Sequence, residues 1–290
     1  CSREENAEKF WATFGAMGLT GIILSAKIKL KNIESAYIRQ ESIKAENLDE
    51  IFQLFEESED WTYTVAWIDC LQKGKNIGRS ILMRGEFAFR AELPQKWQEN
   101  PLRLKKKLSP TIPFYFPSFV LNSFSVRAFN FLYFNKQRQK VVKNFIDYET
   151  FFYPLDAIND WNKIYGKGGF IQYQMVIPKE KGKEGMKKIL ETIGRSGQGS
   201  FLAVLKLFGK GNPEAYNSFP FEGYTLALDF KINRELRQLV DNLDKIVEEF
   251  GGRIYLTKDS MSKPSLTNYL KNVDSSKFVS LQSKRIKRGS

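Results

Sequence analysis

The sequence predicts an α+β protein, in which an antiparallel sheet carries flanking helices. Several short stretches alternate apolar and polar residues, which is typical of strands with one buried face. Longer stretches with apolar residues at helical spacing lie between them. Hydrophobic residues make up 42% and charged residues 27% of the 290-residue chain, so it can bury a sizeable core, and its length suits about two domains.

The first part of the chain is predicted to alternate helices and strands. Residues 10–26 begin as a helix and turn at Gly15 and Gly18. The β-branched run that follows is predicted to be a strand carrying Ile22, Ile23, Ile28 and Leu30. Residues 47–57 are predicted to form a helix and residues 61–70 a strand, each from its hydrophobic period.

An aromatic-rich region follows. Residues 110–119 contain three prolines and cannot form a regular element throughout. Residues 114–153 are crowded with aromatic side chains, between which lie the basic residues Arg127, Lys136, Arg138 and Lys140. The region is either a lid or stacking platform for nucleic-acid bases, or a β-rich wall of the core. We favour the second interpretation.

The hydrophobic periods that indicate strands and helices are clearest in the second half of the chain. Strands are predicted at residues 170–177, 201–208 and 224–230 and, more briefly, at 253–257. A short amphipathic helix is predicted at 184–193, closed by Gly194. A longer helix is predicted from a cap at Asn233 to about residue 250, ended by Gly251 and Gly252, and a polar helical tail ends the chain.

Composition excludes several kinds of chemistry. The chain has no histidine, so a Ser-His-Asp triad and a histidine-ligated zinc site are impossible within it. Its two cysteines, Cys1 and Cys70, form no disulfide framework or thiolate zinc site, so no metal site is expected, and they suit a reducing compartment. The net charge of +12 favours anionic partners, although a solvated lysine-rich surface explains it equally well.

A first residue other than Met indicates a fragment or a processed chain. Residues 10–26 are too short and too broken by glycine for a membrane span.

Three groups of residues are candidates for binding. The glycines of GAMGLTG could let backbone approach a ligand, although their spacing is not the dinucleotide fingerprint and a tight packing turn explains them as well. The side chains of Lys258 and its neighbours in YLTKDS form either a site or a surface loop. Alternation places polar residues on one face of each predicted strand, where they line a pocket or face water. These polar residues are Gln172, Gln174, Lys206, Thr225 and Asp229.

Long segments of the sequence resemble one family. FWATFGAMGLTGIIL, YTVAWIDC, GRSILMRGEF, YPLDAINDWNKIYGKGGFIQYQMVIP, SFLAVLKLFGKGN, LALDF and EFGGRIYLTKDS occur in the order found in FAD-linked oxidases of the vanillyl-alcohol-oxidase fold. Within that family they resemble the decaprenylphosphoryl-β-D-ribose oxidase branch, which is related to the aldonolactone oxidases. The resemblance covers essentially the whole chain.

The resemblance implies a division of the chain. Residues 1–35 would be the end of an FAD-binding domain, residues 36–252 an antiparallel-sheet substrate domain, and residues 253–290 a return to the FAD-binding domain. The glycine-rich loop that holds the FAD pyrophosphate in this family has no match in the chain, so the chain is expected to be a fragment that is inactive by itself.

The resemblance also implies the reaction and its residues. A sugar carbinol would be oxidised by hydride transfer to flavin N5, with FAD supplying the redox chemistry. Lys258 would be the catalytic residue, beside the flavin ring, where its charge stabilises negative charge on the ring. The FAD contacts would be Gly18, Thr20, Ile23, Tyr255 and Lys258. The substrate pocket would be lined by Trp67, Lys163, Gln172, Gln174, Lys206 and Thr225. Lys163 and Thr225 stand where relatives have Arg and Asn, which bears on the substrate more than on the flavin chemistry.

The implied substrate is a polyprenyl-phosphate sugar or a small sugar, and an epimerase would use the keto product. The protein would be cytoplasmic with peripheral membrane contact and would not bind nucleic acid. Two alternatives remain at this point: an aldonolactone or alditol oxidase that uses oxygen, and a non-catalytic basic module that binds nucleic acid through its aromatic segment.

Overall fold

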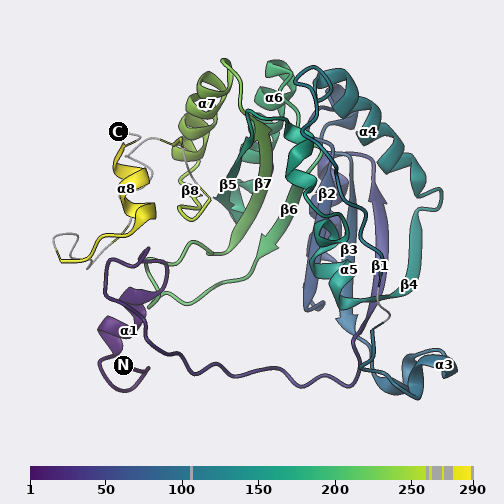
Figure 1. Ribbon diagram of the computed structural model, residues 1–290, viewed down its shortest axis with the longest axis horizontal. Coiled ribbons are helices and arrows are strands. Elements are labelled where there is room, and N and C mark those ends of the chain that lie inside the picture. The colour runs from purple at the N-terminus through teal and green to yellow at the C-terminus, as the bar shows by residue number, and fades with distance from the viewer. Residues whose placement is uncertain (105–106, 259–260, 263–269, 271–276, 289–290) are drawn as a thin grey trace. The chain divides into compact units, whose positions relative to one another are not determined.

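The computed structural model describes residues 1–104, 107–258, 261–262, 270 and 277–288 (Figure 1). The chain divides into two compact units. Unit 1 comprises residues 1–27 and 171–290, and unit 2 comprises residues 28–170. The first and last segments therefore belong with the second half of the chain. The predicted division into FAD-binding and substrate-binding parts concerns function and stays a prediction.

Unit 2 contains four strands in the order β4-β1-β3-β2. They are β1 (Tyr37–Ala45), β2 (Tyr63–Ile68), β3 (Ser80–Phe87) and β4 (Val141–Asp147), and the neighbours pair antiparallel. The helices of this unit are α2 (Leu48–Glu56), α3 (Gln95–Gln98), α4 (Ser123–Lys136) and α5 (Tyr148–Phe152). The predicted helix at 47–57 is confirmed, and Asn47 caps it by accepting a hydrogen bond from the backbone N–H of Glu50 at 3.0 Å.

The strands of unit 1 follow the order β6-β7-β5-β8. They are β5 (Phe170–Pro178), β6 (Ala203–Phe208), β7 (Gly223–Lys231) and the two-residue β8 (Arg253–Ile254). The helices are α1 (Ala7–Thr13), α6 (Gly182–Ser196), α7 (Leu236–Glu249) and α8 (Leu281–Arg288). The strand and helix predictions for this half hold, with shifted ends: α6 runs past Gly194 to Ser196 and is capped by Gly197, and α7 begins after Glu235 instead of at a cap on Asn233. These are mixed helices and antiparallel strands, as the α+β prediction requires.

The apolar strand faces of unit 1 form its core. Tyr173 and Met175 on β5 and Leu226 on β7 are at most 1% exposed, and the inward apolar residues of α6 and α7 are buried as well. The hydroxyl of Tyr173 donates a hydrogen bond to the Asp244 carboxylate of α7 at 2.8 Å, which gives both buried polar groups a partner. The alternate residues of each strand therefore point to the other face of the sheet.

The predicted strand within residues 21–33 is wrong. No residue of this stretch is in a strand, and its apolar side chains are exposed: Ile22 is 79%, Leu24 92%, Ile28 76% and Leu30 82% accessible. A β-branched run favours extended backbone, but a strand also needs a hydrogen-bonding neighbour, and none of the described residues supplies one here.

The β-rich wall predicted for residues 114–153 is also wrong for most of that range. The helix α4 occupies its centre, and only β4 is a strand. Asn122 caps α4 by accepting hydrogen bonds from the backbone N–H groups of Phe124 and Ser125. The buried residues Val126, Asn130 and Phe134 recur every four positions, a helical period that the density of aromatic residues on every side of α4 hides.

Strands β1 and β3 were not predicted from the hydrophobic pattern. The central residues of β1 are buried although polar: Gln40, Glu41 and Ser42 are all under 10% exposed. The carboxylate of Glu41 is paired with Arg84 at 2.7 Å and Lys143 at 2.6 Å. Burial opposes its ionisation, but these hydrogen bonds outweigh burial and lower the pKa of Glu41. Partners on neighbouring strands thus make a polar strand stable in the interior.

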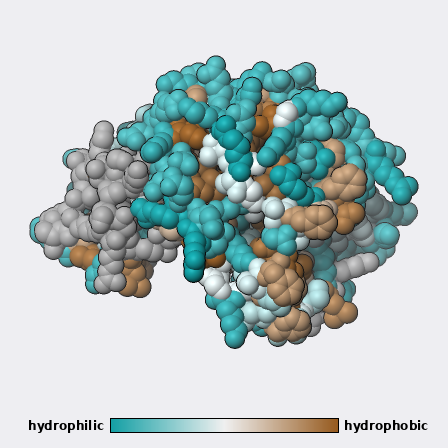
Figure 2. All heavy atoms as spheres, turned by 90° about the horizontal axis from the view of Figure 1, so that it is seen from above, coloured by the Kyte–Doolittle hydropathy of each residue, from teal (hydrophilic) through white to brown (hydrophobic). Residues whose placement is uncertain are grey.

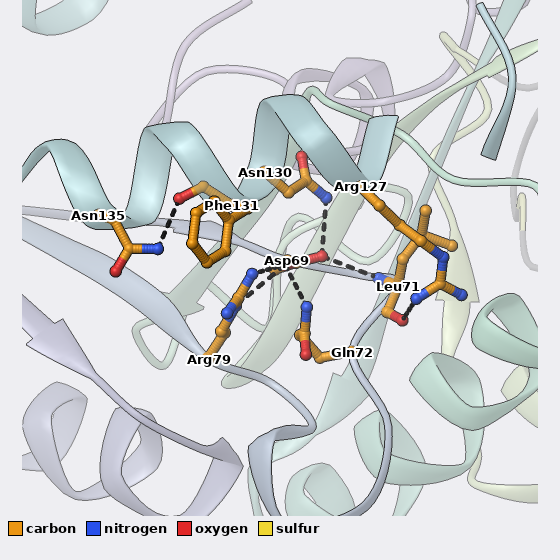
Figure 3. A network of polar contacts seen from close by, with 8 residues as sticks. All are labelled: Asp69, Leu71, Gln72, Arg79, Arg127, Asn130, Phe131 and Asn135. Atoms are coloured by element: carbon orange, nitrogen blue, oxygen red, sulfur yellow. Dashed lines mark hydrogen bonds and ion pairs between the residues drawn. The ribbon is translucent and has the colours of Figure 1, made fainter. Parts of the chain in front are cut away.

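A buried carboxylate fixes α4 to the turn between β2 and β3 (Figure 3). Asp69, 1% exposed, accepts hydrogen bonds from Arg79 at 2.8 Å, from Gln72 at 2.9 Å and from Asn130 of α4 at 2.7 Å. Arg127, one turn earlier in α4, donates to the carbonyl of Leu71 at 3.1 Å. The network holds one side of α4 against the rest of unit 2 and leaves the other side at the surface.

Hydrophilic side chains predominate on the face drawn in Figure 2, with smaller hydrophobic patches between them. Among the described residues, no helix is both long and apolar enough to span a bilayer.

Candidate functional site

The polar residues predicted on alternating strands of unit 1 lie on one face of its sheet. On β5, Gln172 and Gln174 alternate with the core residues Tyr173 and Met175. On β6 and β7, Lys206 stands opposite Thr225 in the antiparallel register, so both point to the same side. We call this side, with Gln172, Gln174, Lys206, Thr225 and Asp229, the polar face.

Hydrogen bonds order the middle of the polar face. The side-chain amide of Gln174 donates to the hydroxyl of Thr225 at 3.1 Å. That hydroxyl donates its own proton to the carbonyl of Met175 at 2.8 Å. Because a threonine hydroxyl has one proton to give, the second bond fixes the direction of the first. The Gln174 amide is therefore held in one orientation, with its oxygen on the side opposite Thr225.

The charge of Lys258 acts on the ammonium group of Lys206 at this face. Lys206 reaches solvent, yet surrounding atoms desolvate its ammonium and lower its pKa, and the charge of Lys258 lowers it further. The two positive charges repel each other, and a bound anion would offset this repulsion, so the site is suited to a negatively charged group such as a phosphate.

Aromatic rings border the polar face. Tyr255 stacks on Phe219 with ring centroids 4.7 Å apart, and Phe219 meets Phe208 of β6 edge-on at 5.9 Å. The backbone N–H of Tyr255 donates to the carbonyl of Gln174 at 2.8 Å, and that of Lys258 donates to the carbonyl of Tyr255 at 3.0 Å. These bonds tie the segment that carries Lys258 to β5. The role of Phe219 was not predicted, because the loop that contains it has no hydrophobic period.

The glycine turn lies in the same unit. Gly15 has φ +77°, and a Cβ there would lie 2.0 Å from the carbonyl oxygen of Asn217, so packing alone requires glycine at this position. Gly18 also has φ +77°, but a Cβ there would meet nothing closer than 3.6 Å. Thr20 donates a hydrogen bond to Thr13 at 3.1 Å. The tight-turn interpretation therefore accounts for Gly15, and Gly18 has space beside it.

The remaining predicted site residues are placed differently. Ile23 is 69% exposed in the extended stretch after the glycine turn. Trp67 belongs to unit 2, where it is 6% exposed and packs against Ile81, Phe134 and Tyr133. Lys163, also in unit 2, forms an ion pair with Asp160 at 2.9 Å. The structure thus brings together Gln172, Gln174, Lys206, Thr225, Tyr255 and Lys258 in unit 1, and the pocket roles of Trp67 and Lys163 stay predictions.

No group of three or more His, Cys, Asp or Glu residues that could hold a metal ion occurs in the described part of the chain. The residues present do fit FAD: the half-buried Lys258, the ring of Tyr255 three residues before it, and a glycine turn with positive φ whose backbone can be approached closely.

No family model matches the chain. The chain is 40% identical over 260 residues to decaprenylphosphoryl-β-D-ribose oxidase of Mycolicibacterium smegmatis, a match covering 88% of this chain and 55% of that protein. It is 27% identical over 265 residues to an uncharacterized protein of Streptomyces coelicolor, covering 89% of this chain and 71% of that one.

Among solved structures, the chain is similar to xylooligosaccharide oxidase from Myceliophthora thermophila in complex with xylobiose. The TM-score is 0.52 at 12% identity, and the match covers 94% of this chain and 57% of that one. The chain therefore spans about half the length of the M. smegmatis oxidase and of the xylooligosaccharide oxidase. These matches bear out the resemblance drawn from the motifs: along nearly nine tenths of its length the chain is similar in sequence to decaprenylphosphoryl-β-D-ribose oxidase of M. smegmatis, and its fold is similar to that of the xylooligosaccharide oxidase.

Proposed function

We propose that the chain is part of an FAD-dependent oxidoreductase that oxidises a sugar hydroxyl by hydride transfer to flavin N5. The observation that carries the proposal is the polar face itself: Lys206, Gln174 and Thr225 lie on one side of the sheet, and the charge of Lys258 reaches Lys206. The 40% identity to a ribose oxidase supports the same reaction class.

FAD, when bound, would supply the hydride acceptor. The chain would hold it through Gly18, Thr20, Ile23, Tyr255 and Lys258. Lys258 would place a positive charge beside the flavin ring, where negative charge develops during the reaction, and a fixed charge needs no reorganisation at that moment. The backbone bond from Lys258 to Tyr255 holds this segment beside β5.

The remaining residues of the polar face would bind the substrate. Lys206 is suited to its phosphate, because an ammonium desolvated by its surroundings gains more from an anion than one in water does. Gln172, Gln174 and Thr225 would hydrogen-bond sugar hydroxyls, and the fixed orientation of the Gln174 amide favours one arrangement of them. The hydroxyl proton of the substrate would leave to a base or to water.

The substrate proposed is a polyprenyl-phosphate sugar, the class named in the M. smegmatis relative. A lysine pair on the polar face favours it over the uncharged substrate of an aldonolactone or alditol oxidase. We further propose that an epimerase consumes the keto product and that the protein works in the cytoplasm, meeting its lipid-linked substrate at the membrane.

The test is selective loss of affinity in the full-length, flavin-loaded protein. Lys206→Met should weaken binding of a phosphorylated sugar by about 1.5–3 kcal/mol, the range for a hydrogen bond to a charged group, and should leave the dephosphorylated analogue nearly unchanged. Lys210→Met, in the exposed loop just after β6, is the matched control and should change neither. Equal weakening of both ligands would show that Lys206 does not contact the phosphate. Absence of flavin bleaching by any sugar in the unmodified protein would refute the reaction.

A further inference from the structure

The charge of the chain is concentrated in one stretch. Residues 100–146 contain nine Lys and Arg residues and no Asp or Glu. The remaining 36 of the 45 basic residues are nearly balanced by the 33 acidic ones. Most of the net charge of +12 therefore belongs to this stretch of unit 2, which includes α4.

The outward side of α4 is apolar. The inward side, with Val126, Asn130 and Phe134, is at most 4% exposed. On the opposite side of the helix, Phe124 is 80%, Phe131 57% and Leu132 68% accessible. Outward-facing helix positions are normally polar, so a stripe of large apolar side chains there marks an interaction surface.

The stripe extends beyond the N-terminus of the helix and has cations at its C-terminal end. Phe119, 75% exposed, precedes the cap, and its carbonyl accepts a hydrogen bond from the side chain of Asn122 at 2.7 Å. Lys136 ends α4 and Arg138 follows it, and both are exposed and form no ion pair with any described residue. We define the α4 surface as Phe119, Phe124, Phe131, Leu132, Lys136 and Arg138.

We propose that the α4 surface docks on an anionic lipid bilayer, with its apolar side chains in the headgroup–acyl boundary and its cations on lipid phosphates. A helix that lies in a membrane interface combines exposed Phe and Leu with Lys and Arg in this way. Other lysines of this stretch are paired with carboxylates of neighbouring segments, as Lys140 is with Glu50. Lys136 and Arg138 have no such partner among the described residues, which leaves their charges for lipid phosphates.

Other occupants fit less well. A second copy of the chain would bring two positively charged stretches together, which electrostatic repulsion opposes. Single-stranded nucleic acid binds in a positively charged groove with stacking rings, whereas the apolar stripe lies on the outer side of a helix and includes the aliphatic Leu132. The Asp69 network holds the inward side of α4 in place, so the stripe is presented on a fixed helix.

The proposal adds the membrane-facing surface to the proposed function, but its test needs neither flavin nor sugar, so either can fail without the other. The protein is sedimented with vesicles of phosphatidylcholine alone and with vesicles that also contain phosphatidylglycerol. We expect binding to the phosphatidylglycerol vesicles, weakened by salt. The double variant Phe124→Ser, Phe131→Ser should lower the partition coefficient at least about tenfold, since each removes a large apolar side chain from the interface. Lys136→Glu with Arg138→Glu should lower it by a similar factor.

Phe89→Ser is the matched control, because Phe89 is 63% exposed in unit 2 but lies outside the α4 surface. The partition coefficient of this variant should stay within about twofold of that of the unmodified protein. Circular dichroism checks that every variant folds. Undiminished vesicle binding by the double serine variant would overturn the proposal. So would binding to an oligonucleotide without vesicle binding, or self-association that the double variant abolishes while vesicles are never bound.

Discussion

At the scale of single residues, Lys206 shows how a charge is kept in an otherwise apolar strand. Its neighbours on β6, Leu205 and Leu207, point toward the helices, and Lys206 points to the polar face beside Thr225. Burial and the nearby Lys258 lower its pKa from the ordinary 10.5. The folded protein therefore holds this ammonium at some cost, which a bound anion would offset.

The lowered pKa of Lys206 predicts that affinity for the substrate depends on pH. Affinity for a phosphate-bearing sugar should fall as the pH rises through the lowered pKa of Lys206, because only the protonated lysine attracts the phosphate. The fall should begin at a lower pH than an ordinary lysine would give, and isothermal titration at increasing pH measures it. In the ligand-free protein the same lowered pKa means that the unfolded state binds more protons, so folding stability should rise with pH across the interval between the two pKa values.

Lys206→Arg separates charge from titration. Arginine stays protonated throughout this range, so the variant should lose the alkaline fall in affinity and retain binding at neutral pH. If the alkaline fall persists in Lys206→Arg, another group is responsible for it.

At the scale of secondary-structure elements, α4 depends on buried polar contacts. Asn130 is fully buried and donates to Asp69, whereas Asn135, in the last turn of the same helix, is exposed and donates to the carbonyl of Phe131 (Figure 3). Asp69 keeps Arg79 and Gln72 as donors when Asn130 is removed, but a buried charge that loses one of its donors costs more than the loss of an exposed hydrogen bond.

Asn130→Ala should therefore destabilise the protein by about 1–3 kcal/mol and increase hydrogen exchange along α4. Asn135→Ala is the matched control on the same helix and should change the free energy of unfolding by less than about 0.5 kcal/mol. Denaturant unfolding measures both. Equal effects of the two substitutions would mean that the Asp69 contact does not hold α4.

At the scale of the whole molecule, the contacts proposed for FAD come from two separate segments of unit 1, at Gly18–Ile23 and at Tyr255–Lys258. The apolar side chains at the end of the first segment and just after it, Ile22 to Leu24, are all at least 69% exposed. A cofactor held by so few groups gains little binding energy from them.

The 290-residue chain by itself is therefore expected not to retain FAD during purification, whereas a longer protein containing it should be yellow. Absorbance at flavin wavelengths, compared with the protein concentration, measures the stoichiometry. Nearly one equivalent of FAD on the isolated chain would contradict this expectation and would show that the two segments suffice.

The sequence by itself determined the elements whose hydrophobic period is clear. The alternation in β5 places Gln172 and Gln174 on one face, and the helical spacing in α2, α6 and α7 predicts their buried sides, because these periods reflect backbone geometry alone. The motif resemblance also indicated the oxidase relationship that the 40% identity confirms.

Tertiary structure decided the rest. The register of β6 against β7 places Lys206 beside Thr225, and no pattern within either strand specifies which residues face each other across the pair. Partners from distant segments make β1 stable although Glu41 lies at its centre, and the lack of a pairing neighbour leaves residues 21–33 outside any strand. In each case the outcome depends on contacts between residues far apart in the chain, which local propensity does not encode.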